Sequence, residues 1–138
     1  MRFSYFPRPY VDQKTQKIID VFRPEIPIRL AYGHRLYPNP ILALLDSGAD
    51  NNLFPSKYAL LLGLNFRKGA KRLITGIGNH QIDAYRFPVI LYIEEMKINT
   101  NIDFCESQQT PILGRHDFFK YFSKISFKEK HKSIIIDL

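Results

Sequence analysis

The stretch Leu44-Leu45-Asp46-Ser47-Gly48-Ala49-Asp50 is the most informative in this chain. An apolar run over residues 41–45 passes straight into an acidic residue, which a hydroxyl residue and a glycine follow. A strand that ends in this way delivers a carboxylate to the floor of a cleft. There Ser47 supplies a hydroxyl for nearby hydrogen bonds, and Gly48 allows another backbone to approach closely. The triplet alone also fits a polar turn, because Asp, Ser and Gly are common turn residues.

The composition is typical of a single folded domain. With 138 residues, 45% of them apolar, the chain is long enough for one domain with a hydrophobic core and too apolar to be disordered. The net charge of +7 is compatible with nucleic acid, an anionic membrane or acidic substrates as partners. However, the Lys and Arg residues are spread along the whole chain, and Glu129 interrupts their densest group. We therefore do not expect nucleic-acid binding as the main function.

Cysteines, histidines and apolar runs argue against a metal centre and a membrane segment. Cys105 is the only cysteine, and the four histidines show no spacing typical of paired metal ligands. The N-terminus lacks the apolar core of a signal peptide, and no apolar run approaches the ~18 residues of a membrane span. We therefore expect a cytoplasmic protein that needs no metal or cofactor and does not bind membranes.

Alternating apolar residues predict a mostly β protein. Residues 25–32 alternate as a half-buried strand, and residues 41–45 are apolar on both faces. Two long alternating runs, 85–93 and 98–104, form a hairpin around a turn at Glu94-Glu95. Weaker strands are predicted at 17–22, 71–75, 125–127 and 133–138, and short helices at 57–62 and 116–122. In the first helix we expect Tyr58, Leu61 and Leu62 to face the core. Short strands with turns at this spacing favour an all-β sandwich or barrel.

Three signals stand in a fixed order along the chain. Gly76-Ile77-Gly78 lies between two predicted strands, 30 residues after Asp46, and Gly114 of Ile112-Leu113-Gly114-Arg115 lies 68 residues after it. Over residues 25–138 this order resembles the retropepsin family, the single-domain aspartic proteases of retroviruses and their cellular relatives. The run Leu53-Phe54-Pro55 into a short helix looks more like the bacterial and cellular members. The resemblance implies an all-β, closed retropepsin-like (acid protease) barrel. Residues 1–24 lie outside it, as an N-terminal extension of unknown role.

The resemblance also implies a role for each matched residue. Asp46 would be the catalytic aspartate, supported by the other residues of its loop, Ser47, Gly48 and Ala49. Gly76, Ile77 and Gly78 would form the flap that closes over a peptide, and Ile112, Leu113 and Gly114 would form the ψ-loop packed behind the catalytic loop. Asp50 and Arg115 would form an ion pair beside the active site and the dimer interface. His116-Asp117 departs from the family, because viral members usually carry Asn after the Arg.

A metal-free aspartic site hydrolyses peptides with two carboxylates that share one proton, because two neighbouring charges are costly. This chain holds only one such Asp-Ser-Gly triplet, so the second carboxylate must come from another copy. We therefore expect a homodimeric aspartic endopeptidase that acts on peptide or protein substrates, with Asp46 of each subunit meeting on a two-fold axis.

Three alternative hypotheses remain at this point. A retropepsin-like domain that no longer cuts would keep the fold as a dimerisation or peptide-binding module. A basic β-barrel that binds RNA or single-stranded DNA would suit the charge and the aromatic content, but it leaves Asp46 unexplained. A serine hydrolase led by Ser47 lacks the Gly-x-Ser-x-Gly elbow of that class.

Overall fold

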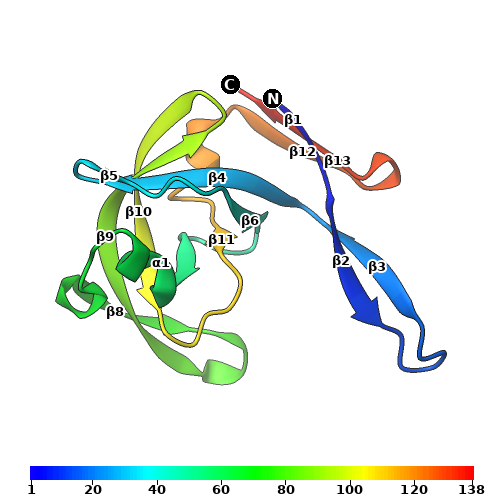
Figure 1. Ribbon diagram of the computed structural model, residues 1–138, viewed down its shortest axis with the longest axis horizontal. Helices are drawn as coiled ribbons and strands as arrows, with labels where there is room; N and C mark the ends of the chain where they lie inside the picture. Colours follow the sequence, from blue (N-terminus) through cyan, green and yellow to red (C-terminus); the bar gives the residue numbers. More distant parts are fainter.

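Six strands close into a barrel in the computed structural model, which describes residues 1–138. Strands make up 54% of the chain (Figure 1). The thirteen strands are β1 (Arg2–Ser4), β2 (Phe6–Val11), β3 (Ile18–Arg23), β4 (Glu25–Tyr32), β5 (Arg35–Leu36), β6 (Ile41–Leu45), β7 (Leu53–Pro55), β8 (Ala70–Thr75), β9 (Gln81–Ile93), β10 (Met96–Cys105), β11 (Ile112–Leu113), β12 (Lys124–Lys128) and β13 (Ser133–Asp137). The helical segments are α1 (Ser56–Leu61) and the 3₁₀ turns η1 (Phe66–Lys68), η2 (Ile77–Asn79), η3 (Phe119–Tyr121) and η4 (Glu129–His131).

The barrel closes because β4 pairs on both of its edges. The strands follow one another in the order β4-β6-β11-β7-β10-β9, and β9 pairs back with β4. Strand β6, which carries the chain to Asp46, lies between β4 and β11. β8 extends the sheet beyond β9, so that β8 and β9 form a long hairpin. The expected closed, all-β barrel is confirmed.

Both ends of the chain lie in a separate three-stranded sheet, in the order β1-β13-β12. Tyr5, directly after β1, is buried, and its hydroxyl donates a hydrogen bond of 2.7 Å to Glu129 Oε1. Burial, together with this carboxylate, raises the pKa of Tyr5 to about 12. The start of the chain is therefore fastened to its last hairpin.

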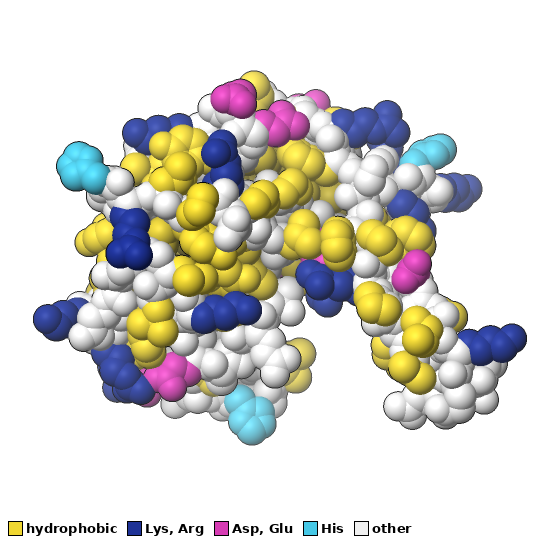
Figure 2. All heavy atoms as spheres, in the orientation of Figure 1, with side chains coloured by type: hydrophobic (Ala, Val, Ile, Leu, Met, Phe, Trp, Pro, Cys, Tyr) yellow, Lys and Arg dark blue, Asp and Glu magenta, His cyan; other side chains and the backbone are white.

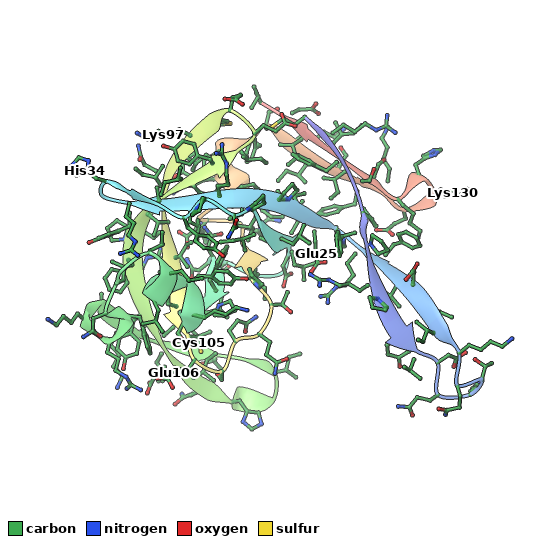
Figure 3. The ribbon with its side chains drawn as sticks, in the orientation of Figure 1. Glu25, His34, Lys97, Cys105, Glu106 and Lys130 are labelled. Atoms are coloured by element: carbon green, nitrogen blue, oxygen red, sulfur yellow. The ribbon has the colours of Figure 1, made fainter.

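Residues 6–23, which we call the arm, form a two-stranded hairpin of β2 and β3 that projects from the barrel (Figure 1). In the space-filling view, open space separates most of the arm from the rest of the molecule (Figure 2). Glu25, the first residue of β4, lies where the arm joins the barrel (Figure 3). The predicted strand near residues 17–22 is confirmed as β3, whereas its partner β2 had no signal that we recognised.

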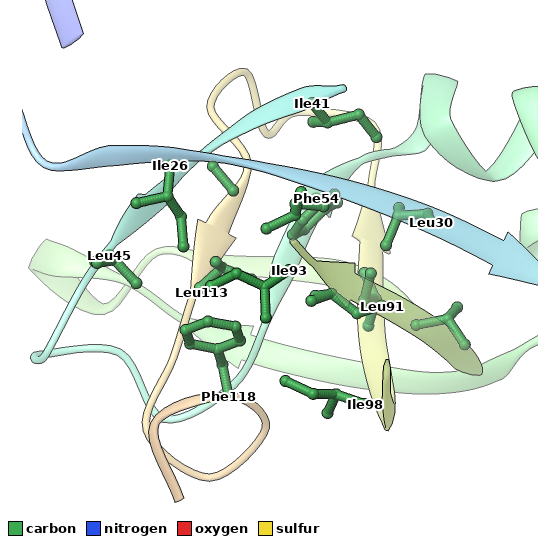
Figure 4. Packing of buried hydrophobic residues seen from close by; sticks show 14 of the residues in the cluster. Ile26, Leu30, Ile41, Leu45, Phe54, Leu91, Ile93, Ile98, Leu113 and Phe118 are labelled. Atoms are coloured by element: carbon green, nitrogen blue, oxygen red, sulfur yellow. The ribbon is translucent and has the colours of Figure 1, made fainter. Parts of the chain in front are cut away.

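The core fills the barrel with side chains from alternating strand positions. It comprises 22 buried residues, among which Leu91, Leu113 and Phe118 are fully covered (Figure 4). Ile26 and Leu45 belong to this cluster, so β4 and β6 contribute to it beside the loop that follows β6. Because β6 is anchored in the core and ends directly before Asp46, the barrel sets the position of Asp46.

The helical predictions are correct only in part. The first helix forms as Ser56–Leu61. Leu61, which we expected to face the core, is exposed, and Ala59 is buried instead. The second predicted helix, 116–122, is a single 3₁₀ turn at Phe119–Tyr121. Phe118 and Phe122 are still buried there, so the apolar residues serve the core without forming a regular helix. No helix of the structure has the length and apolar character needed to cross a membrane.

Candidate active site

Asp46 stands at the end of β6, held by backbone hydrogen bonds on both sides. The Leu45 amide donates to the Pro24 carbonyl at 3.0 Å, and the Asp46 amide donates to the Leu113 carbonyl at 3.1 Å. The carboxylate is partly exposed, and its Oδ1 accepts a hydrogen bond of 2.9 Å from the Gly48 amide. No side chain of this chain donates to it, so its Oδ2 has no hydrogen-bond partner within the chain.

The rest of the Asp46 loop is built around this carboxylate. A Cβ atom at Gly48 would lie 3.3 Å from Asp46 Oδ1, closer than a side chain comfortably approaches. Ser47 is exposed and makes no hydrogen bond within the chain, and it lines a surface hollow together with Arg115 and Phe119. The Ala49 carbonyl accepts a hydrogen bond of 2.8 Å from the Arg115 amide, which ties the loop to the segment after β11.

The segment Ile112-Leu113-Gly114 packs directly behind the loop. Ile112 and Leu113 pair in parallel with Leu44 and Leu45. A Cβ atom at Gly114 would lie only 2.5 Å from the Asn51 carbonyl oxygen, so any side chain here would push the loop backbone away. This contact explains why a glycine follows the two apolar residues.

The expected ion pair between Asp50 and Arg115 is not formed within the chain. The backbones of the two segments do meet, because the His116 amide donates to the Asp50 carbonyl at 2.7 Å. The basic side chain within 4.0 Å of the Asp50 carboxylate is His116, whose Nε2 lies at 4.0 Å, and both of these side chains are largely exposed. Arg115 is exposed and has no carboxylate within 4.0 Å. Within one chain both side chains are exposed, and their two segments touch through their backbones instead.

Asp117 makes the buried charged contacts beside the Asp46 loop. Its carboxylate is buried and accepts hydrogen bonds from the Asn52 amide at 3.1 Å and from Asn51 Nδ2 at 3.0 Å. Asn52, fully buried, accepts a hydrogen bond of 3.0 Å from the Gly114 amide through its Oδ1. The sequence had marked Asp117 as a departure from the family, but nothing local showed that its side chain turns inward.

Two arginines of the β8–β9 hairpin reach the same buried cluster. Arg86 donates to Asp117 Oδ1 at 2.6 Å and to Asp103 Oδ1 at 3.2 Å. Arg72 donates to Asn51 Oδ1 at 3.1 Å, and its Nε lies 3.9 Å from Asp103 Oδ1. Burial raises the pKa of the Asp103 carboxyl above its ordinary value, although both arginines act in the opposite direction. Charged groups therefore join the base of the β8–β9 hairpin to the Asp46 loop.

The tip of the β8–β9 hairpin holds the predicted flap residues. The Gly76 amide donates to the His80 carbonyl at 2.7 Å, and Gly78 has a φ of +75°, which side chains rarely adopt. Ile77 is 98% exposed, so this apolar side chain has no partner in the chain. A groove of about 360 Å³ runs between the hairpin and the Asp46 loop, lined by Gly48, Ala49, Asp50, Asn51, Leu53, Arg72, Leu73, Ile74, Thr75 and Ile112.

Comparisons with known proteins agree with this architecture. No protein-family model and no curated protein matches the sequence. Among solved structures 224 chains match, including one described as EIAV protease complexed with the inhibitor HBY-793. That protein is 24% identical with a TM-score of 0.52, and the match covers 67% of this chain and 82% of that one. At this level of identity the likeness shows the fold, and this chain therefore shares the β-barrel of a retroviral protease.

Proposed function

We propose that this chain is an aspartic endopeptidase whose active site forms when two copies bring their Asp46 residues together. The observation that carries the proposal is the state of Asp46 itself. Its partly exposed carboxylate is held by the Gly48 amide at the end of a barrel strand, and its Oδ2 has no hydrogen-bond partner within the chain. No second carboxylate of the same chain forms a hydrogen bond with it. The chain thus presents half of a two-carboxylate site, and a symmetric dimer supplies the other half.

The two carboxylates would activate a water molecule between them. Because neighbouring like charges are costly, the pair shares one proton. The ionised Asp46 takes a proton from the water, whose oxygen attacks the carbonyl carbon of the scissile bond. The protonated carboxyl, the partner's Asp46, gives its proton to the carbonyl oxygen. When the resulting diol collapses, the C–N bond breaks and a proton returns to the leaving amine.

The groove beside the Asp46 loop supplies a binding surface for an extended peptide. Backbone groups of β8 and of residues 48–51 lie on its two sides, where a peptide strand can form main-chain hydrogen bonds. Ile77 at the exposed flap tip would be covered when the hairpin closes over the peptide or meets its counterpart. Closure would exclude bulk water and keep only the reacting water between the carboxylates, as lids do in other enzymes.

The test is cleavage of denatured casein by purified protein at several pH values, with sedimentation on the same samples. Asp46→Asn should abolish cleavage and leave the dimer intact, because the amide keeps the size of the side chain but cannot accept the proton. Glu95→Gln, an equal change in the exposed turn between β9 and β10, should keep full activity. Cleavage by the pure Asp46→Asn protein would remove Asp46 from this role. A wild-type dimer that cuts nothing would favour the peptide-binding module instead.

A further inference from the structure

Beyond its root, where Arg8 contacts Glu25, the arm, residues 6–23, is largely exposed. Its two strands pair only with each other, from Phe6 opposite Arg23 to Val11 opposite Ile18. An isolated two-stranded hairpin is marginally stable in water. This one also exposes many large apolar side chains, namely Tyr10, Val11, Ile18, Ile19, Val21 and Phe22. Three of these side chains lie on each face of the hairpin, Tyr10, Ile19 and Val21 on one and Val11, Ile18 and Phe22 on the other. So much exposed apolar surface indicates a binding surface rather than a solvated hairpin.

One face of the arm is turned toward the barrel side. Arg8 Nε lies 2.8 Å from the carboxylate of Glu25, which is buried at the start of β4. Because side chains alternate along a strand and paired residues share a face, Tyr10, Ile19 and Val21 lie on the same face as Arg8. We call these four residues the inner face. Ile18 lies on the opposite, outer face.

The arm leaves the barrel beside the candidate active site. Pro24, between the arm and β4, accepts the hydrogen bond of the Leu45 amide at 3.0 Å, one residue before Asp46. Glu25 is in register with Leu44 on the neighbouring strand. A second copy that brings its own Asp46 to this point therefore arrives next to the root of the arm. At about 3.3 Å per residue, the six residues of each arm strand reach roughly 20 Å along that copy.

We propose that the inner face of the arm packs on a second copy of this chain, so that each subunit of the dimer clasps the other. This inference rests on the proposed function, because the site is incomplete without that copy. A stable interface needs about 800 Å² from each partner. The short Asp46 loop and the flap tip are small elements, whereas the arm adds a long apolar surface on the same side of the molecule. The second copy is thus the occupant that the position of the arm favours.

A matched pair of substitutions on one strand tests the proposal. Ile19→Asp places a charge on the inner face, and Ile18→Asp places the same charge on the outer face, next to it in the chain. Ile19 is 44% exposed and Ile18 is 74% exposed, so neither change should unfold the barrel, which the melting temperature checks. Because a charge on a face that packs against a second copy would be buried without a partner, Ile19→Asp should weaken the dimer at least about tenfold. Ile18→Asp should leave the dimer constant within about twofold. Equal effects of the two substitutions, or no effect of Ile19→Asp, would overturn the proposal.

A photoreactive benzophenone side chain at position 19 provides a second measurement in the full-length protein. In a mixture of isotopically light and heavy chains, cross-links from position 19 should join light to heavy chains, and position 18 should give few. Cross-links confined to one chain would show that the arm folds back on its own barrel, which would overturn the proposal. The proposed function has its own readout, since dimerisation and casein cleavage by the wild-type protein are measured independently of the arm.

Discussion

At the scale of single residues, Asp117 holds together the segments that surround the candidate site. Its buried carboxylate holds the Asn52 amide at 3.1 Å and Arg86 at 2.6 Å. Asp117→Ala would leave these donors without their partner, and loss of one member of a buried charged cluster costs about 3–5 kcal/mol. We expect the melting temperature to fall by roughly 10 °C in calorimetry.

Asp83→Ala is the control for this prediction. Asp83 lies 3.7 Å from Lys71, but both side chains are more than half exposed. An exposed pair of this kind contributes about 0–1 kcal/mol. The melting temperature should therefore change by no more than a few degrees. Similar losses in the two variants would mean that burial of Asp117 has no special role.

Asp103 should make stability depend on pH in a direction opposite to that of a carboxylate whose pKa an ion pair lowers. Burial raises its pKa in the folded state, and its Oδ2 has no hydrogen-bond partner. The folded protein therefore binds this proton more tightly than the unfolded chain, so the contribution of Asp103 to stability falls as pH rises from its ordinary pKa to its raised pKa. Asp103→Asn removes that loss. The melting temperature of the variant, relative to wild type, should thus be higher at pH 7 than at pH 4, and the reverse trend would contradict the assignment.

At the scale of elements, the contact between the Asp46 loop and β11 depends on one glycine. Gly114→Ala would place a methyl group 2.5 Å from the Asn51 carbonyl oxygen, and backbone there cannot move aside without shifting the loop. Overpacking of this kind costs about 1–3 kcal/mol. We expect a lower melting temperature and, at temperatures where the variant is still folded, a lower kcat for casein. In Gly76→Ala the nearest atom is 3.8 Å away, so its melting temperature should stay unchanged.

At the scale of the whole molecule, the proposed site belongs to a dimer and should respond to mixing. Wild-type chains mixed with an excess of Asp46→Asn chains exchange into dimers that hold only one functional carboxylate. We expect casein cleavage to fall as the share of variant chains rises, in proportion to the wild-type pairs that remain. Addition of the same excess of an unrelated, stably folded protein should have no such effect. Activity that is indifferent to the Asp46→Asn chains would place a complete site in each monomer.

The amino-acid sequence by itself determined the β class, most strands of the barrel and the order of the three motifs. These features are local: alternation shows which face of a strand is buried, and an apolar strand running into Asp-Ser-Gly shows where a carboxylate emerges. The glycine of Ile112-Leu113-Gly114 was likewise visible, although its reason, the close approach of Asn51, was not.

Only the tertiary structure decided how distant segments use their polar side chains. Asp117 reaches the Asn52 amide across 65 residues of sequence, while the Asp50 and Arg115 side chains form no ion pair although backbone hydrogen bonds join their segments. The tertiary structure also closes the barrel, through the pairing of β4 with β9, and keeps the arm as a separate sheet. The physical reason is that a side chain pairs with whatever the completed fold brings within hydrogen-bond distance, and neither periodicity nor spacing along the chain records that distance.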